Sequence, residues 1–492
     1  MNARPLIAIC GTTGVGKSNL SIELALALAD SRGIRKHGWM GARIINADSM
    51  QVYAGMDVIT NKVPESGRQG VEHLLMSFKK PGEQYVVGDW VRDAIREIHE
   101  THAQHKIPIV VGGTSYWIQH LIFPDRLTLN LKSPRSPNRP ATPVLSDDLA
   151  QSVSSLPQEA QDLLRDLPQE PPDASADPRS AFSLYDLLKN LDPTAASRWH
   201  WRDTRKVLRS LDIIKETGRK PSDIWNEQAQ DDVKPRYRTL CFWLYAEPSA
   251  LNPRLDARVD DMIKHGLLDE ILSLQKIATA GADLRIAPAV DYTLGIYQAI
   301  GYKEFHAYLN SPTRSEEAFR DAVDRMKLST KQYAQRQVKW IRNKLLPAVY
   351  AAQAAEGGKE SIRAYLLDAT SVDETWNVNV NEKGKAIMHD FLEERPLPDP
   401  LELSNAARSM LTIPGSPSSP IVRRKLVCDV CTTNTEEPVM IEEGEQWEVH
   451  RKTKAHKMMA TREARWAEVA KWKKIKEERM ERKITDAAVI DQ

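Results

Sequence analysis

The chain has 492 residues of ordinary globular composition, with 41% hydrophobic and 27% charged residues. No run of about 18 consecutive apolar residues occurs, which argues against an integral membrane protein, and four cysteines are too few for a disulfide scaffold. The net charge of +1 hides a segregation, because residues 450–483 hold 13 basic and 5 acidic residues whereas residues 1–449 hold 55 and 60. A basic tail on an acidic body indicates a polyanionic partner.

Short apolar runs alternate with helical patterns near the N-terminus. Strands are predicted at 6–10, 43–47 and 107–111, and a helix at 18–29. This alternation predicts a parallel sheet, in which ligands bind outside the carboxyl ends of the strands. The three predicted strands are each followed by a distinctive motif, namely GTTGVGKS (11–18), DSMQVY (48–53) and GGTSYW (112–117).

The first motif has the form G-x4-G-K-S between a strand and a helix, which is typical of a phosphate-binding loop. In such a loop backbone amides surround phosphate oxygens, Lys17 reaches the terminal phosphates and Ser18 can hold Mg²⁺. The sequence therefore predicts a site for a diphosphate or triphosphate. Its residues are Gly11, Thr12, Thr13, Gly14, Val15, Gly16, Lys17 and Ser18.

The other two motifs leave alternatives open. The carboxylate of Asp48, beside a phosphate site, can bind Mg²⁺ or act as a general base, but Asp48 also suits a helix N-cap. Thr114 offers a hydroxyl donor to a ligand, and it fits a helix cap equally well.

Later segments add helices and a linker. Residues 124–178 contain ten of the 29 prolines, which indicates that part of this range is a flexible insertion. A strand is predicted at 238–246. Long helices are predicted at 252–278 and 315–346. These patterns predict a first part of the α/β core (1–123), a helical insertion with a Pro/Ser-rich part (124–235), a second part of the core (236–396), a linker (397–422), and a zinc finger with a basic helical tail (423–483).

Two basic stretches favour nucleic acid. Residues 198–220 hold eight Lys/Arg against three acids, and residues 320–344 hold eight against two. The second stretch is amphipathic: Phe319, Val323, Met326, Tyr333 and Trp340 form an apolar stripe, with Lys327, Lys331, Lys339 and Arg342 off it. A basic helix face suits a phosphate backbone, although a solvated face is the alternative.

Near the C-terminus two cysteines and two histidines have the spacing of a zinc site. Cys428 and Cys431 are followed, after 18 residues, by His450 and then His456. Thiolates and imidazoles are ligands for tetrahedral zinc, although the middle segment is longer than the usual ~12 residues of a finger. Chance spacing of the cysteines is the alternative.

The ordered motifs resemble the tRNA dimethylallyltransferase (tRNA isopentenyltransferase) family over residues 5–346. The series continues through RDTRKVLRSLDI (202–213), ARVDDMIKHGLLDEI (257–271), GIYQAIGYKEF (295–305) and KQYAQRQVKWIRNK (331–344). The finger resembles the extension of eukaryotic members. Two departures occur: the loop has Gly-Thr-Thr where many members have Gly-Pro-Thr, and Glu72-His73 stands where many have His-His.

The resemblance implies a P-loop NTPase-like α/β fold and transfer of a dimethylallyl group from its diphosphate to N6 of the adenosine 3′ of the anticodon. It implies Asp48 as general base, and Thr114, Arg258, Lys17 and a Mg²⁺ near Ser18 as stabilisers of the leaving diphosphate. The target base would leave the anticodon stack to reach the site. The implied tRNA contacts are Asp48, Ser49, Met50, Gln51, Arg205, Lys206, Val207, Leu208 and Arg209.

The expected partners are dimethylallyl diphosphate and the anticodon stem-loop of tRNA, with structural Zn²⁺ in the finger, no membrane, and a monomeric state. No leader is visible at the start, so a cytoplasmic location is expected, with mitochondrial or nuclear pools as alternatives. Three rival functions remain: an adenylate isopentenyltransferase, a P-loop small-molecule kinase and a non-catalytic RNA-binding scaffold. A small nucleotide needs neither the finger nor the basic tail.

Overall fold

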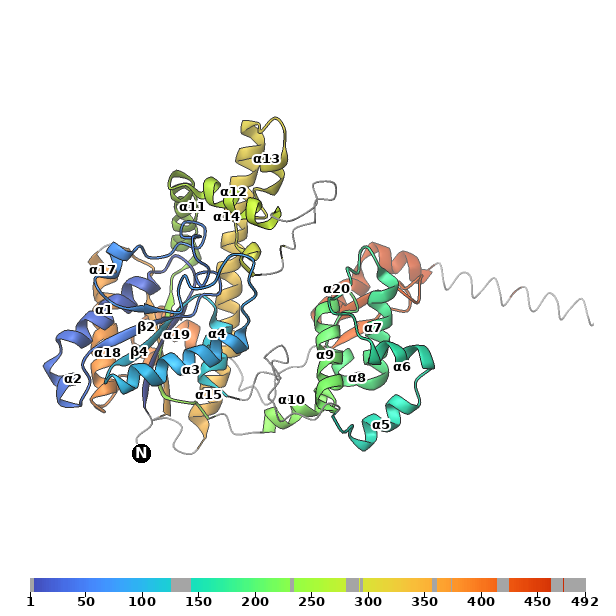
Figure 1. The fold of residues 1–492 in the computed structure, drawn as a ribbon, viewed down its shortest axis with the longest axis horizontal. Coiled ribbons are helices and arrows are strands. Elements are labelled where there is room, and N and C mark those ends of the chain that lie inside the picture. The colour runs from blue at the N-terminus through green and yellow to red at the C-terminus, as the bar shows by residue number, and fades with distance from the viewer. Residues whose placement is uncertain are drawn as a thin grey trace, which may run out of the picture. The chain divides into compact units, whose positions relative to one another are not determined.

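The structure is a computed structural model that describes residues 4–124, 143–230, 234–279, 292, 295–355, 361–372, 374–413, 424–461 and 472. The chain divides into two compact units, each built from two separate segments (Figure 1). The first unit comprises residues 1–127 and 232–416, and the second comprises residues 128–231 and 417–492. Within the described residues, no helix combines the length and the apolar character needed to cross a membrane.

A six-stranded parallel sheet forms the centre of the first unit, in the order β3-β2-β4-β1-β5-β6. The strands are β1 (Pro5–Gly11), β2 (Ala42–Asn46), β3 (His73–Leu74), β4 (Ile107–Val111), β5 (Arg238–Tyr245) and β6 (Ile362–Asp368). Every residue of β1 and β4 is buried, as expected for strands covered on both faces. The predicted parallel sheet is confirmed, and β3 and β6 extend it at its two edges.

Alternate side chains of each strand enter two different cores. In β1, Leu6 and Ala8 belong to one apolar cluster, and Ile7 and Ile9 belong to the other. Helices cover both faces of the sheet (Figure 1). Those of the first cluster include α3 (Val87–Ala103), α4 (Ser115–Ile122) and α15 (Leu346–Ala354), and those of the second include α1 (Lys17–Asp30) and α18 (Lys383–Leu392).

The second half of this unit contributes the helices that complete the site. The predicted helix at 252–278 is two helices, α11 (Pro248–Lys264) and α12 (Leu267–Thr279), because Gly266 adopts a left-handed conformation (φ +94°) between them. The predicted helix at 315–346 is α14 (Glu316–Trp340), continued by the π-helical segment η3 (Ile341–Leu345). Shorter elements are α2 (Arg32–Lys36), η1 (Glu65–Arg68), η2 (Gly295–Gln298), α13 (His306–Asn310), α17 (Glu374–Trp376) and η4 (Asn377–Glu382).

The predicted linker at 397–422 is wrong for its first half. Residues in this range form η5 (Pro400–Glu402) and α19 (Asn405–Leu411). Ala407 and Leu411 are buried in the first core, and the Tyr350 hydroxyl donates to the Leu411 carbonyl (2.7 Å). Apolar residues at helical spacing therefore attach this segment to the first unit, and residues 414–422 lie outside the described part.

The second unit contains helices and a small hairpin. The Pro-rich range 124–178, predicted to be flexible in part, holds two helices, and Leu149 of the first is fully buried. Residues 125–142 lie outside the described part. The elements are α5 (Asp147–Ser154), α6 (Gln158–Arg165), α7 (Pro178–Leu191), α8 (Pro193–Ala196), α9 (Thr204–Thr217), α10 (Pro221–Gln230), β7 (Lys425–Val427), β8 (Met440–Glu442) and α20 (Glu445–Lys452).

The C-terminal hairpin packs on the insertion helices and shares their core. Met440 of β8 is buried in the same cluster as residues of α7 and α9. The indole N–H of fully buried Trp201 donates to the Pro438 carbonyl (2.9 Å), and the Lys425 amide donates to the Ser197 carbonyl (2.6 Å). The segment that contains the finger is therefore an integral part of the second unit. Most of the predicted basic tail lies outside the described residues.

Candidate active site

The loop between β1 and α1 has features that suit the predicted phosphate-binding turn. Gly16 is the N-cap of α1 with φ +86°, and a Cβ at this position would come within 2.7 Å of the Trp376 ring. Glycine is therefore required both by conformation and by space. The loop ends at the N-terminus of a 14-residue helix, whose first amides have no partner within the helix and favour an anion.

Two cations reach this loop. The Lys17 ammonium donates to the Thr12 carbonyl (2.7 Å), and Arg258 of α11 donates from Nη1 to the Thr13 hydroxyl (2.6 Å). Burial lowers the pKa of Lys17 to about 8, while the Asp48 carboxylate acts in the opposite direction. Burial also lowers the pKa of Arg258, again opposed by Asp48. Two partly desolvated cations beside one carboxylate favour an additional anionic ligand.

Asp48 is held by its own turn. The Asn46 side chain accepts from the Asp48 amide (3.1 Å) and donates to the Asp48 carbonyl (3.1 Å). Oδ1 of Asp48 accepts from the Met50 amide (3.0 Å), so this carboxylate caps a turn rather than a helix. Oδ2 lies near Gly113, where a Cβ would come within 3.2 Å of it. The same Cβ would come within 2.7 Å of Nε2 of Gln337 and 3.6 Å of the Tyr333 hydroxyl, so only glycine leaves room between Asp48 and α14 here.

Thr114 connects the end of β4 to the Asp48 turn. Its hydroxyl accepts from the Ser49 amide (3.1 Å) and donates to the Ser49 hydroxyl (3.2 Å). Thr114 is also the N-cap residue of α4, although its side chain makes no capping hydrogen bond. At Gly112 a Cβ would collide with the Ala47 carbonyl at 2.1 Å, so these two strand ends can approach only through glycine.

Two functional candidates on α14 were missed by the sequence analysis. The Gln337 side chain accepts from the Thr13 amide (2.9 Å) and donates to the Gly113 carbonyl (2.9 Å), which joins the phosphate loop to the end of β4. Tyr333, one turn earlier, has its pKa raised by burial and by Asp48. The available signal was a glutamine on the apolar stripe of the predicted helix, at i+4 from Tyr333.

Several predicted contacts have other partners. Gln51 donates to the carbonyls of Thr60 (3.1 Å) and Asn61 (3.3 Å), which fixes the loop after Asp48, and Met50 packs against the first core. On α14, Lys327 and Lys331 form ion pairs with Asp260 and Asp256 of α11. Two of the four residues predicted to form the basic face therefore pair with acidic residues of the same unit.

The predicted RNA-contacting segment of α9 divides into two faces. Arg205 and Lys206 are exposed, whereas Val207 and Leu208 have only 0% and 5% exposure because they pack in the core of the second unit. The side chains of Val207 and Leu208 therefore stabilise the helix rather than face solvent, and contact of this segment with RNA stays a prediction. Arg209 lies with Arg205, one turn away on the same helix.

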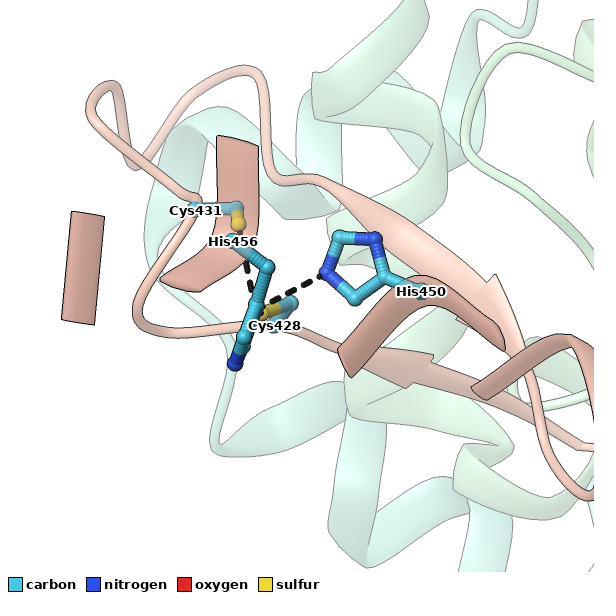
Figure 2. Close-up of side chains that lie close together, drawn as sticks. All are labelled: Cys428, Cys431, His450 and His456. Carbon is cyan, nitrogen blue, oxygen red and sulfur yellow. Dashed lines mark hydrogen bonds between the residues drawn. The ribbon is translucent and has the colours of Figure 1, made fainter. Parts of the chain in front are cut away.

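The four predicted metal ligands come together (Figure 2). Nδ1 of His456 lies 3.4 Å from the sulfur atoms of both Cys428 and Cys431 and 3.2 Å from Nε2 of His450. Ligands ~2.0–2.3 Å from one tetrahedral Zn²⁺ lie about 3.5 Å apart, so the donor set fits zinc in both chemistry and spacing. The hairpin β7–β8 followed by α20 has the ββα order of a finger.

The long middle segment of this finger has a structural explanation. Its extra residues form a loop whose Glu436 and Glu437 pair with Arg179 and Arg202 of the insertion. The same loop supplies the Pro438 carbonyl to Trp201. The segment that makes the spacing longer than usual therefore includes the residues that contact the insertion.

The site can be compared with known proteins. The model of the IPP transferase family matches residues 51–344. The chain belongs to this family. It is 37% identical to the tRNA dimethylallyltransferase of Schizosaccharomyces pombe over 94% of its length and 97% of the relative's. Identity to the Saccharomyces cerevisiae enzyme is 34%, with 97% of both chains covered.

A solved structure of a eukaryotic dimethylallyltransferase acting on tRNA is similar to the whole chain. The TM-score is 0.70 at 31% identity, covering 96% of this chain and all of the other. The IPP transferase match includes α9, α11 and α14, and hence Arg258, Tyr333 and Gln337. The phosphate loop and Asp48 precede the matched range.

Proposed function

We infer that this protein is a tRNA prenyltransferase that moves a dimethylallyl group from dimethylallyl diphosphate to tRNA. Membership of the IPP transferase family and the similarity to tRNA dimethylallyltransferases along nearly the whole chain support this function. The observation that carries the mechanism is the convergence of Lys17, Arg258 and Asp48 at one end of the sheet. We propose N6 of the adenosine 3′ of the anticodon as the acceptor.

The cationic side of the site suits the leaving group. The amides of residues 11–18, the Lys17 ammonium and the Arg258 guanidinium would bind the diphosphate and stabilise the charge that grows as the allylic C–O bond breaks. Thr114 would act by fixing the Asp48 turn through Ser49. The Ser18 hydroxyl and diphosphate oxygens are hard ligands that fit Mg²⁺, which would neutralise part of the developing charge.

Asp48 is proposed as the general base. The adenine amine is a weak nucleophile because its lone pair is delocalised into the ring. As N6 forms the new C–N bond to the allylic carbon, diphosphate leaves with the electrons of the C–O bond. The amine proton passes to the Asp48 carboxylate, whose Oδ2 lies near Gly113. Ser49 and Gln51 would shape the base pocket.

The second unit is proposed to bind the anticodon stem-loop. Arg205, Lys206 and Arg209 of α9 would contact the RNA, and the zinc finger with the basic tail would contact phosphates of the stem. A monomer in the cytoplasm, with mitochondrial or nuclear pools, remains our prediction for the state and location of the protein.

One assay tests this function. Purified protein is incubated with labelled dimethylallyl diphosphate and bulk tRNA, and the label is mapped after nuclease digestion. We expect label on N6 of the adenosine next to the anticodon, and none on free AMP. Prenylation of AMP would instead indicate an adenylate isopentenyltransferase. Transfer of the γ-phosphate of ATP to a small molecule, without any prenylation, would indicate a kinase.

A further inference from the structure

A groove on the second unit has no role in the chemistry described above. It lies between α9 and α10 and has a volume of about 490 Å³, within the range of roughly 300–1,000 Å³ that is usual for small-ligand sites. Ser210 and Ile213 are its buried residues. The other side chains that line the groove are aromatic or charged, and these are the groups that could bind a ligand.

Two tryptophans contribute the aromatic lining. Trp199 and Trp225 lie with ring centroids 6.2 Å apart and planes at 89°. The Trp199 N–H donates to the Ser210 hydroxyl (3.2 Å), and the Arg198 guanidinium lies 4.1 Å from the Trp225 centroid. Both rings are therefore held in place before any ligand arrives. Ordered aromatic rings of this kind offer a stacking surface to a flat ligand.

Basic side chains from α9 supply the charged lining. Arg205, Lys206 and Arg209 line the groove together with a single acid, Asp203, so its charged groups sum to +2. Lys206 forms an ion pair with Asp203 and lies 5.0 Å from the Trp199 centroid. An incoming phosphate would compete with Asp203 for Lys206. The released carboxylate could then accept a hydrogen bond from the edge of a base.

We propose that this groove binds one unpaired nucleotide of the RNA substrate, with its base stacked on the tryptophans and its phosphates on the basic residues of α9. Stacking on aromatic rings beside cations is how proteins bind unpaired bases. Asp48 belongs to the first unit and does not line the groove, so the bound base is a second one and not the base that is prenylated. This inference rests on the proposed tRNA substrate.

The test combines a protein change with a scan of the RNA. The dissociation constant of the full-length protein is measured for anticodon stem-loop RNAs that each carry one abasic residue in the loop. We expect one position, other than the target, at which the abasic change weakens wild-type binding by about 5- to 150-fold. The same abasic change should weaken binding by Trp225→Ala no further, because the stacking partner is already missing.

Controls separate this contact from a loss of folding or of function. Trp225→Phe keeps an aromatic ring and should retain the coupling, and Arg165→Ala, an exposed cation on α6 outside the groove, should leave the affinity unchanged. Arg205→Gln should reduce the salt dependence of binding by about one ion. The melting temperature and the affinity for dimethylallyl diphosphate report whether each variant folds.

Additive losses at every loop position, or no loss with Trp225→Ala, would overturn the groove as a nucleotide site. The coupling is measured by binding alone. A wild-type protein that binds these RNAs but prenylates none would therefore contradict the proposed function and leave the groove result readable.

Discussion

At the scale of single residues, Asp48 is positioned by hydrogen bonds within its own turn and lies beside two cations, Lys17 and Arg258. The Asn46 side chain fixes its backbone, the Met50 amide donates to one carboxylate oxygen, and the other oxygen lies near Gly113. The sequence singled out Asp48 as a candidate because a carboxylate after a strand is a local pattern, and its role as general base stays a prediction. The sequence did not identify Gln337, since this residue reaches the loop from a helix 324 positions away in the chain.

Replacing Asp48 by Ala should separate binding from chemistry. The variant should keep its affinity for tRNA and lose turnover by at least ~10²-fold, because the amine proton loses its acceptor. Single-turnover prenylation and a binding assay on the same RNA provide the measurement. Asp30→Ala, which removes an exposed carboxylate at the end of α1, is the control and should leave turnover unchanged. Turnover within a few-fold of wild type for the Asp48 variant would show that another group removes the proton.

Gln337→Leu should weaken both the fold and the diphosphate site. The change leaves the Thr13 amide and the Gly113 carbonyl without their partner, which costs about 1–3 kcal/mol for a buried polar group. Urea unfolding gives the free-energy change, and titration with dimethylallyl diphosphate gives the change in affinity. Gln335→Leu, an exposed position on the same helix, should change neither quantity. Equal effects in the two variants would mean that the two hydrogen bonds of the Gln337 side chain contribute neither to stability nor to affinity.

At the scale of elements, the sequence predicted correctly those features whose pattern lies within a short stretch of the chain. The strand at 107–111 matches β4 residue for residue, and the finger ligands lie together as their spacing indicated. The strand β6 and the helix α19 were missed. Both depend on distant partners, β6 on pairing with β5 and α19 on packing into the first core. Such contacts leave little trace in local spacing.

Zinc removal should loosen the insertion helices as well as the finger. Met440 and the Pro438 carbonyl belong to the finger but complete the surroundings of Trp201, so loss of the metal should expose that core. We expect faster amide hydrogen exchange in α7 and α9 after chelation, restored by adding Zn²⁺, and the same effect in Cys431→Ser. Exchange in β1 and β4 is the internal control. Unchanged protection of α9 would show that the insertion folds without the finger.

At the scale of the whole molecule, charge is distributed unevenly along the chain, and this was readable from composition. An acidic body and a tail of net charge +8 predict that RNA binding depends on phosphate neutralisation. The division into two units was less accessible, because each unit joins segments that are far apart in sequence. No local pattern records which segments will share a core.

Affinity for tRNA should therefore fall steeply as salt rises. Changing Lys473, Lys474 and Lys476 to Gln should lower the slope of log K against log salt by up to about three, one per lost cation. Changing the three cations of α2, Arg32, Arg35 and Lys36, should leave it unaltered. If the affinity of the wild type for tRNA did not change with salt, the basic tail would have no part in RNA binding.

The shared core of insertion and finger also has a consequence for the nascent chain. Trp201 leaves the ribosome long before Met440, and at ~5–20 residues per second the interval is roughly 10–50 s. During this time the insertion helices expose apolar surface that only the C-terminal segment will cover. The second unit therefore completes its core only after the segment around Met440 has been synthesised, later than its own helices α7 and α9.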